Sequence, residues 1–239
     1  MQAEPLLATR VVALANSLAF NRTRQVIADV RSAVSLLGVK LIRSLATALI
    51  MRQMAQASDG DEQRRMAARL WEHTAHVAAL AHVLTRKLER PDADTALFAG
   101  MVHDVGAFYL ISRVNAYPSL LEALCAWQEA RSTRLESTSG AWSQAAEAQI
   151  GRAVLRALTV PESVIEAIEA LWAGAPQQGE PRLGDTLSLA HSLTPISSPF
   201  APIAPEPLDS TTPAADPWLA SVLADSAEEL SSLNAALRV

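Results

Sequence analysis

Residues 61–89 read DEQRRMAARLWEHTAHVAALAHVLTRKLE, and their apolar side chains recur at intervals of three and four residues. At about 100° per residue, this spacing gathers the larger apolar side chains on one stripe of an amphipathic helix: Leu70, Val77, Leu80, Leu84 and Leu88. His73 lies inside that stripe, His76 lies at its flank, and His82 lies on the opposite side, which we expect to face solvent. The segment therefore predicts a long helix with one histidine aimed into the core.

The neighbouring segments show the same helical spacing, and none alternates strictly over the length of a strand. Gly38, Pro91 and Pro161 are typical of helix boundaries. The predicted helices cover residues 4–19, 26–37, 39–57, 61–89, 93–114, 118–136, 141–158, 161–173 and 183–194. No repeat of fixed period relates these helices. The sequence thus predicts an all-α fold, an orthogonal multi-helix bundle rather than a repeat solenoid.

Composition excludes several classes of protein. Half of the 239 residues are hydrophobic and 19% are charged, which excludes a disordered chain and suffices for a core without disulfides. The single cysteine, Cys125, fits a reducing compartment. A net charge of −5 argues against a general nucleic-acid binder. The N-terminus lacks the basic region of a signal peptide, and no run of 18 or more uncharged apolar residues suits a membrane span. We expect a soluble, cytoplasmic protein.

Further polar side chains lie on helix faces that should be apolar. Asp104, with His103 beside it, falls in the middle of one apolar stripe, and Glu147 and His191 each fall on another. A carboxylate aimed into a core is costly unless a cation, a metal or hydrogen-bond donors meet it. One explanation is a metal site, because carboxylate and imidazole ligands suit Zn, Mn or Fe. The other is a buried hydrogen-bonded pair in which Asp104 and His73 or His103 fix the helix packing.

Two motifs resemble the main signatures of the HD superfamily: LWEHTAHVA at residues 70–78 and FAGMVHDVG at residues 98–106. Four shorter segments make the chain more similar to the HDOD (HD-related output domain) branch: RVVALANS at 10–17, AVSLLG at 33–38, QIG at 149–151 and VPE at 160–162. The resemblance covers roughly residues 5–194. It implies an HD-domain-like bundle. The family's domain usually starts some helices earlier, so this chain is expected to be short at its N-terminus.

The resemblance also implies a partly retained metal site. In a catalytic HD phosphohydrolase, a helix histidine, the His-Asp pair and a later aspartate bind the metal that activates water for attack on a phosphoester. His73, His103 and Asp104 match three of these positions, and His191 stands at the position of the later aspartate. Glu147 stands where two-metal members have a further histidine. The resemblance thus implies a set that can hold one metal ion, with Glu147 as a further ligand.

The paired histidines of the two-metal members are replaced by Leu171–Trp172, which cannot ligate a metal. The HDOD resemblance and this loss favour a non-catalytic bacterial signal-transduction output module that acts through protein partners and keeps a degenerate HD site. The alternative enzyme would be a mononuclear phosphohydrolase acting on a nucleotide or phosphodiester, with Glu147 as ligand or general base. A third hypothesis is a nucleotide second messenger bound without chemistry near the same side chains. The implied cofactor is one divalent ion, Zn, Mn or Fe, and both a monomer and a dimer fit.

The chain divides into four predicted parts. Residues 1–60 form the N-terminal helical part of the HDOD-like domain, and residues 61–194 form its HD-like core. Residues 195–217 contain seven prolines and predict an extended linker. Residues 218–239 predict an amphipathic helix, which either docks on its own bundle or binds a partner. The partner-binding interpretation uses the apolar residues at the start of that helix: Trp218, Leu219, Val222 and Leu223.

Overall fold

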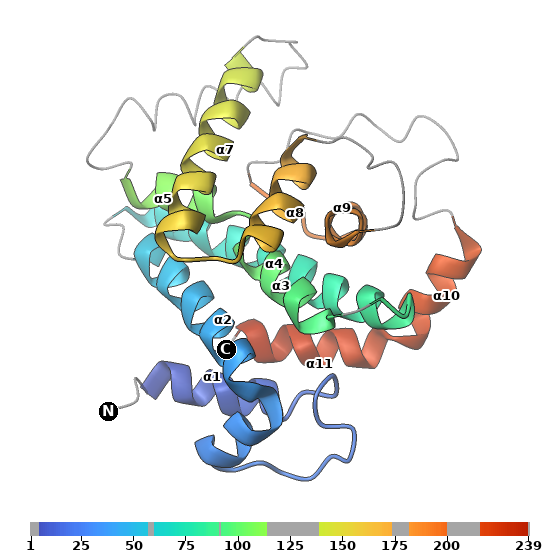
Figure 1. Cartoon of the computed structure of the whole chain (residues 1–239). Coiled ribbons are helices and arrows are strands. Elements are labelled where there is room, and N and C mark those ends of the chain that lie inside the picture. The colour runs from blue at the N-terminus through green and yellow to red at the C-terminus, as the bar shows by residue number, and fades with distance from the viewer. Residues whose placement is uncertain are drawn as a thin grey trace.

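The structure, a computed structural model, describes residues 5–56, 60–90, 92–113, 139–173, 182–199 and 216–238. Within these ranges every regular element is a helix, which confirms the predicted all-α bundle (Figure 1). The helices are α1 (Pro5–Ala15), α2 (Val30–Gln56), α3 (Asp61–Lys87), α4 (Ala93–Val102), α5 (Val105–Arg113), α7 (Ser139–Ala157), α8 (Glu162–Ala173), α9 (Leu183–Leu193), α10 (Pro217–Asp225) and α11 (Ala227–Arg238).

The central helix is α3, which packs against α2, α4, α5, α9 and α11. Small buried side chains along α3, among them Ala75, Ala78 and Ala79, let its neighbours approach closely. The closest approach is at Gly100 of α4, where an added Cβ would lie 2.5 Å from the Cα of Ala78. Only glycine leaves room for this contact. The backbone of α4 therefore rests directly on α3, and this contact positions the residues that follow Gly100.

The prediction of one helix over residues 93–114 is wrong, because the chain turns at His103 and Asp104 and forms α4 and α5. His103 Nδ1 lies 2.8 Å from the carbonyl oxygen of Gly100 and donates to it. In a continuous helix that carbonyl would accept from the amide of Asp104. The imidazole therefore replaces a helical hydrogen bond, and α5 restarts with the amide of Phe108 bonded to the carbonyl of Asp104.

Near the N-terminus, the predicted boundary at Gly38 is confirmed as a kink within α2. Gly38 has φ of 76°, a left-handed conformation that other residues adopt with strain. The helix predicted over 4–19 ends earlier, at Ala15. The side-chain amide of Asn16 donates to the carbonyl of Ile27 at 2.7 Å, and its Oδ1 accepts from the amide of Ile27 at 2.9 Å. This reciprocal pairing closes an irregular loop before α2.

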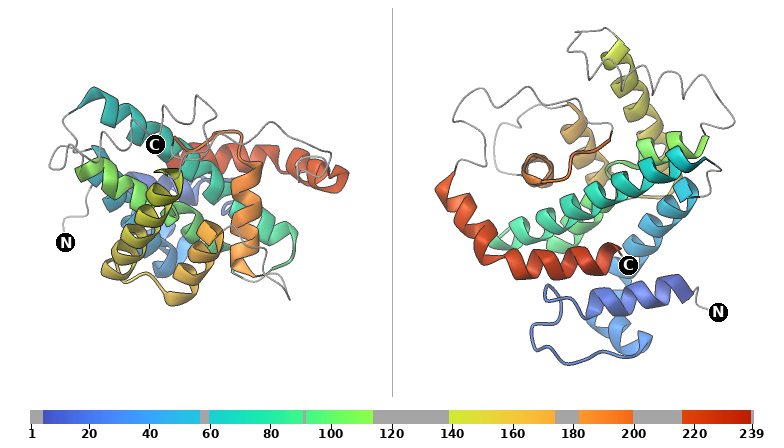
Figure 2. Two further views of the ribbon diagram at one scale, coloured as in Figure 1. Left: turned by 90° about the horizontal axis from the view of Figure 1, so that it is seen from above. Right: turned by 180° about the vertical axis from the view of Figure 1, so that it is seen from behind.

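The predicted C-terminal helix is two helices, α10 and α11, which separate at Ser226. The views in Figure 2 show α11 lying beside α3 and α1, which it contacts. The carbonyl of Leu237 accepts hydrogen bonds from Arg10 Nη1 at 2.9 Å and from Trp71 Nε1 at 3.2 Å. Ion pairs also join α11 to preceding parts of the chain: Arg24–Glu228, Arg86–Glu229 and Glu72–Arg238. The second helix of the pair therefore docks on its own bundle.

The four residues predicted to meet a partner differ in exposure. Leu219 is 4% exposed and belongs to the hydrophobic core, so the prediction that it contacts a partner is wrong for this conformation. Val222 and Leu223 are half-buried. Trp218 is 51% exposed and is the most accessible of the four. Burial of Leu219 follows from the docking of the C-terminal helices. Of the predicted linker, residues 200–215 lie outside the described residues.

Two described stretches, Val30–Gln53 and Ala93–Arg113, are long and apolar enough to cross a membrane by length and composition alone. In the second stretch, 83% of the most apolar window is buried inside the protein, and the turn at His103 interrupts it. The first stretch is 39% buried in its most apolar window and is kinked at Gly38. Core helices of soluble proteins meet the same criterion. The burial of the second stretch identifies it as part of the core.

Candidate metal centre

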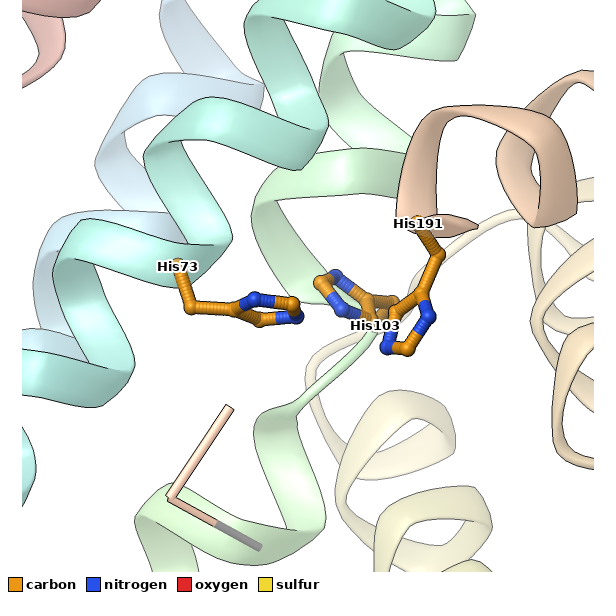
Figure 3. Close-up of side chains that lie close together, drawn as sticks. All are labelled: His73, His103 and His191. Carbon is orange, nitrogen blue, oxygen red and sulfur yellow. The ribbon is translucent and has the colours of Figure 1, made fainter. Parts of the chain in front are cut away.

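Three histidines from three separate elements converge on one point (Figure 3). His73 projects from the middle of α3, His103 from the turn between α4 and α5, and His191 from the last turn of α9. One ring nitrogen from each lies within 4.8 Å of the others. The ring centroids are 5.0 Å apart for His73 and His191, 5.6 Å for His73 and His103, and 5.8 Å for His103 and His191. The fold thus brings together side chains up to 118 positions apart in the sequence.

Asp104 adds a carboxylate to this cluster. Its Oδ2 lies 3.3 Å from Nε2 of His103 and 3.8 Å from Nε2 of His73. All three atoms are buried, and among the described residues none of them has a hydrogen-bond partner. Buried polar atoms are nearly always paired, and leaving one unpaired costs about 1–3 kcal/mol. Three such atoms that face one another therefore form a set that could hold a cation.

The opposite nitrogens of two of these imidazoles are held by backbone carbonyls. Nδ1 of His73 lies 2.6 Å from the carbonyl oxygen of Ile196, and Nδ1 of His103 lies 2.8 Å from that of Gly100. A carbonyl can only accept, so each Nδ1 carries the proton and each Nε2 keeps its lone pair. Histidines that bind metals commonly donate their second N–H to a carbonyl or carboxylate in this way. The two carbonyls thus orient Nε2 of His73 and His103 as metal ligands.

Burial also keeps two imidazoles of the cluster, those of His103 and His191, in the protonation state that binds metals. Desolvation lowers the pKa of His103 below its ordinary value of 6.5, even though the neighbouring Asp104 favours the charged ring. Desolvation, with a smaller contribution from His103, lowers the pKa of His191 to about 4. Both rings are therefore neutral near pH 7. Neutral imidazole is the form that coordinates a metal.

This donor set fits one divalent metal ion. His73, His103 and His191 offer three imidazoles and Asp104 offers one carboxylate, and first-row ions such as Zn, Mn and Fe accept both ligand types. Four protein ligands are typical of closed structural zinc sites, whereas catalytic zinc sites keep one position for water. The side chain of Glu147, the predicted further ligand, lies outside the described residues.

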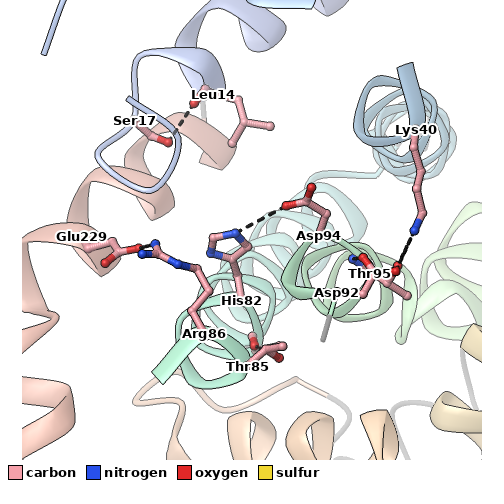
Figure 4. Close-up of polar contacts among 11 residues, drawn as sticks. Leu14, Ser17, Lys40, His82, Thr85, Arg86, Asp92, Asp94, Thr95 and Glu229 are labelled. Atoms are coloured by element: carbon pink, nitrogen blue, oxygen red, sulfur yellow. Dashed lines mark hydrogen bonds and ion pairs between the residues drawn. The ribbon is translucent and has the colours of Figure 1, made fainter. Parts of the chain in front are cut away.

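The other histidines do not belong to the cluster. The prediction that His82 faces solvent is wrong, since it is 2% exposed. The ring centroids of Phe20 and His82 are 5.1 Å apart. Asp94 Oδ1 lies 3.6 Å from Nε2 of His82 (Figure 4). That side of α3 is covered by α11 and by the loop after α1, which the helical pattern of α3 could not reveal. His76 is half-buried, with Nδ1 2.9 Å from the carbonyl of Glu72.

Leu171 and Trp172, which stand at the position of the paired histidines in the resemblance, pack against the hydrophobic core. Trp172 of α8 lies against Gly151 of α7, where an added Cβ would approach Cη2 of the indole to 2.6 Å. The roles of the carbonyls of Ile196 and Gly100 cannot be predicted from the sequence, because a backbone group carries no residue-specific signal. The proline after α9 marks the segment that contains Ile196, but the sequence does not show where that segment lies.

A comparison with protein families matches the HDOD domain model to residues 1–173. The chain belongs to the HDOD domain family. His191 and the C-terminal helices lie beyond the residues that the HDOD model matches, so the third histidine of the cluster comes from outside the matched segment. No curated protein matches this HDOD chain.

Two solved structures resemble this HDOD protein in fold. One is a protein from Shewanella amazonensis SB2B whose assignment as a metal-dependent phosphohydrolase is provisional, with 21% identity and a TM-score of 0.68 over 98% of this chain and 81% of the other. The second is an HDOD domain protein of unknown function from Geobacter sulfurreducens, with 17% identity and a TM-score of 0.62 over 98% of this chain and 82% of the other. At these identities the likeness establishes the HD-like helical fold.

Proposed function

We propose that this HDOD protein is a non-catalytic, cytoplasmic signal-transduction module of bacteria that acts through protein partners and is stabilised by one bound divalent metal ion. The observation that carries the metal assignment is the convergence of three buried, unpaired atoms: Nε2 of His73, Nε2 of His103 and Oδ2 of Asp104. A divalent cation would be the positively charged partner of the Asp104 carboxylate. His191 completes a set of four protein ligands.

The proposed ligands cross-link distant parts of the chain. His73 belongs to α3, His103 and Asp104 to the turn after α4, and His191 to α9. The carbonyl of Ile196 adds the segment that follows α9. A filled site would therefore stabilise the packing of α9 and of the start of the proline-rich segment on α3. For a four-coordinate zinc ion this structural role is favoured over hydrolysis, because four protein ligands leave no position for water.

The proposed partner surface is the exposed part of α10. Trp218 presents half of its surface to solvent at the start of this helix. Exposed tryptophans are frequent anchors of protein interfaces. Leu219 is excluded from this surface by its burial, and Val222 and Leu223 could contribute only their exposed edges.

Elemental analysis of protein purified without a metal-affinity tag tests the metal site. We expect about one metal ion per chain in the wild type and loss of that metal in Asp104→Asn. Asp94→Asn is a matched control, because Asp94 also faces a histidine, His82, but lies outside the cluster. Wild-type protein that retains no metal after incubation with Zn²⁺, Mn²⁺ or Fe²⁺ would refute the proposed site.

A second candidate function is mononuclear phosphohydrolysis, and the position of His191 favours it. His191 is partly exposed, whereas His73 and His103 are buried, so solvent reaches the cluster from the side of α9. The metal-loaded protein is assayed with bis(p-nitrophenyl) phosphate and with nucleotides. We expect no turnover. Hydrolysis that Asp104→Asn abolishes and Asp94→Asn retains would replace the non-catalytic proposal. Stabilisation by a nucleotide without turnover, lost in Asp104→Asn, would instead support a second-messenger binder at the cluster.

A further inference from the structure

Two adjoining cavities flank the first turn of α4, at the opposite end of this helix from His103. The larger, about 400 Å³, lies between α2, α4 and the turn from α7 to α8. The smaller, about 200 Å³, lies between the ends of α3, α4 and α9. Asp92 and Thr95 line both cavities and mark their junction. The ten residues of α4 separate this place from the histidine cluster by about 15 Å.

Positive charge is concentrated in these cavities. Lys40 and Arg43 line the larger cavity, and Arg90 and Arg182 line the smaller. Asp92 is the one acidic residue among the described residues that line either cavity. The whole chain carries a net charge of −5. The four cations and one carboxylate that line the cavities make the local charge positive instead. Such a concave cationic surface favours an anionic ligand.

The single carboxylate is already paired. Lys40 Nζ lies 2.7 Å from Oδ2 of Asp92 and 2.9 Å from Oγ1 of Thr95 (Figure 4). The backbone amide of Thr95 donates to Oδ1 of Asp92 at 3.0 Å, which caps α4. Burial alone would raise the pKa of Asp92, but the bonds from Lys40 and Thr95 lower it below its ordinary value. Asp92 is therefore ionised, and Lys40 balances its charge.

The remaining three cations form no ion pair with a described carboxylate. Arg90 donates to the hydroxyl of Thr186, which holds its guanidinium at the wall of the smaller cavity. Arg182 is exposed and immediately precedes the first turn of α9, which contributes Leu183 to the lining; the carboxylate of Asp185 already caps this end of the helix by accepting from the backbone amide of Arg182 at 2.6 Å. Two guanidinium groups and threonine hydroxyls are groups that recognise phosphate.

The larger cavity is suited to an organic group. Its walls combine apolar side chains, including Val39, Phe98, Val160 and Val164, with the hydroxyls of Ser44 and Thr47. Its volume falls in the range of cofactor and small-molecule sites, about 300–1,000 Å³. Arg43 at its wall offers a second cation to an anionic or carbonyl group of the ligand.

We propose that these two cavities form one binding site for an organic phosphate, with the phosphate between Arg90 and Arg182 and the organic part against Val39 and Phe98. The site is separate from the metal centre. The proposed ligand is a small molecule that binds without contacting the cluster of His73, His103, His191 and Asp104.

Isothermal titration calorimetry of the full chain with 5′-mononucleotides and sugar phosphates tests the proposal, and phosphorus NMR follows inorganic phosphate. Arg182→Gln removes one exposed cation of the phosphate subsite, and we expect it to weaken binding at least about tenfold. Arg65→Gln is the matched control, since Arg65 is also exposed but pairs with Glu62 near the other end of α3. Val39→Trp places a bulky group at the exposed wall of the larger cavity.

The expected result is saturable binding of at least one organic phosphate that Arg182→Gln and Val39→Trp weaken and Arg65→Gln leaves unchanged. Val39→Trp should not affect inorganic phosphate. Binding should also persist in metal-free Asp104→Asn, which separates this site from the metal centre. The proposal is overturned if no compound binds saturably at millimolar concentration, or if Arg65→Gln weakens binding as much as Arg182→Gln. Loss of binding in Asp104→Asn but not in Arg182→Gln would also overturn it and place the ligand at the metal centre.

Discussion

Substitution of Asp104 by asparagine separates a metal centre from a packing element, because the two predict a loss of stability under different conditions: only with metal for a metal centre, and already in chelator for a packing element. Asp104 is 8% exposed, and its Oδ2 has no hydrogen-bond partner among the described residues. Without metal, the substitution removes a buried charge and costs little or nothing in free energy of unfolding. With metal, it removes a ligand and the stabilisation that depends on it.

The size of that stabilisation follows from mass action. A metal present at 100 times its dissociation constant adds about 2.7 kcal/mol to the free energy of unfolding. For a chain of 239 residues, each kcal/mol raises the melting temperature by about 2–4 °C. We therefore expect saturating Zn²⁺ to raise the melting temperature of the wild type by about 5–11 °C and to leave Asp104→Asn unchanged.

The assay is thermal unfolding followed by circular dichroism, first with a chelator and then with Zn²⁺, Mn²⁺ or Fe²⁺, on the wild type, Asp104→Asn and the control Asp94→Asn. The control should respond to metal as the wild type does. Two results together would refute the metal centre: no metal raises the melting temperature of the wild type, and in chelator Asp104→Asn is less stable than the wild type by several kcal/mol. Asp104 would then be a hydrogen-bonded packing residue.

Three further predictions concern the fold around the site. Metal-free protein should lose stability as the pH falls from 6.5 towards 4, because His191 has a pKa of about 4 when folded and about 6.5 when unfolded, so the unfolded chain takes up the proton first. The loss attributable to His191 reaches about 3 kcal/mol, and a urea midpoint that is constant between pH 5 and 7 would contradict it. Gly100→Ala should destabilise the protein by about 1–3 kcal/mol, measured by urea unfolding, since the added Cβ would clash with the backbone of Ala78. Gly38→Ala is the comparison variant: its Cβ would meet no atom within 4 Å, so its effect reports backbone strain without a clash. Leu237→Ala should cost about 2–5 kcal/mol in the same assay because Leu237 is buried in the core, and an effect below 1 kcal/mol would show that α11 detaches in solution.

Local patterns in the sequence determined the class of fold and most of the candidate site. The apolar period of residues 61–89 predicts α3, and the His-Asp motif predicts the side chains that meet at the cluster. The polar residues on apolar helix faces and the HD resemblance together single out His73, His103, Asp104 and His191 as candidates, and the structure places these side chains close to one another. Gly38 likewise marks its kink, since its conformation favours glycine.

Only the tertiary structure decided which faces are covered and which backbone groups reach the site. His82 is buried because α11, more than 140 positions away, packs on α3, and no periodicity within α3 records that contact. The turn at His103 depends on an imidazole that replaces a helical hydrogen bond, and the orientation of His73 depends on the carbonyl of Ile196. Arg43, Arg90 and Arg182 are far apart in the sequence and share a surface only after α2, α3, α4 and α9 have packed. Helical period is a property of neighbouring residues, whereas burial, carbonyl partners and cavities arise from segments that meet only in the folded chain.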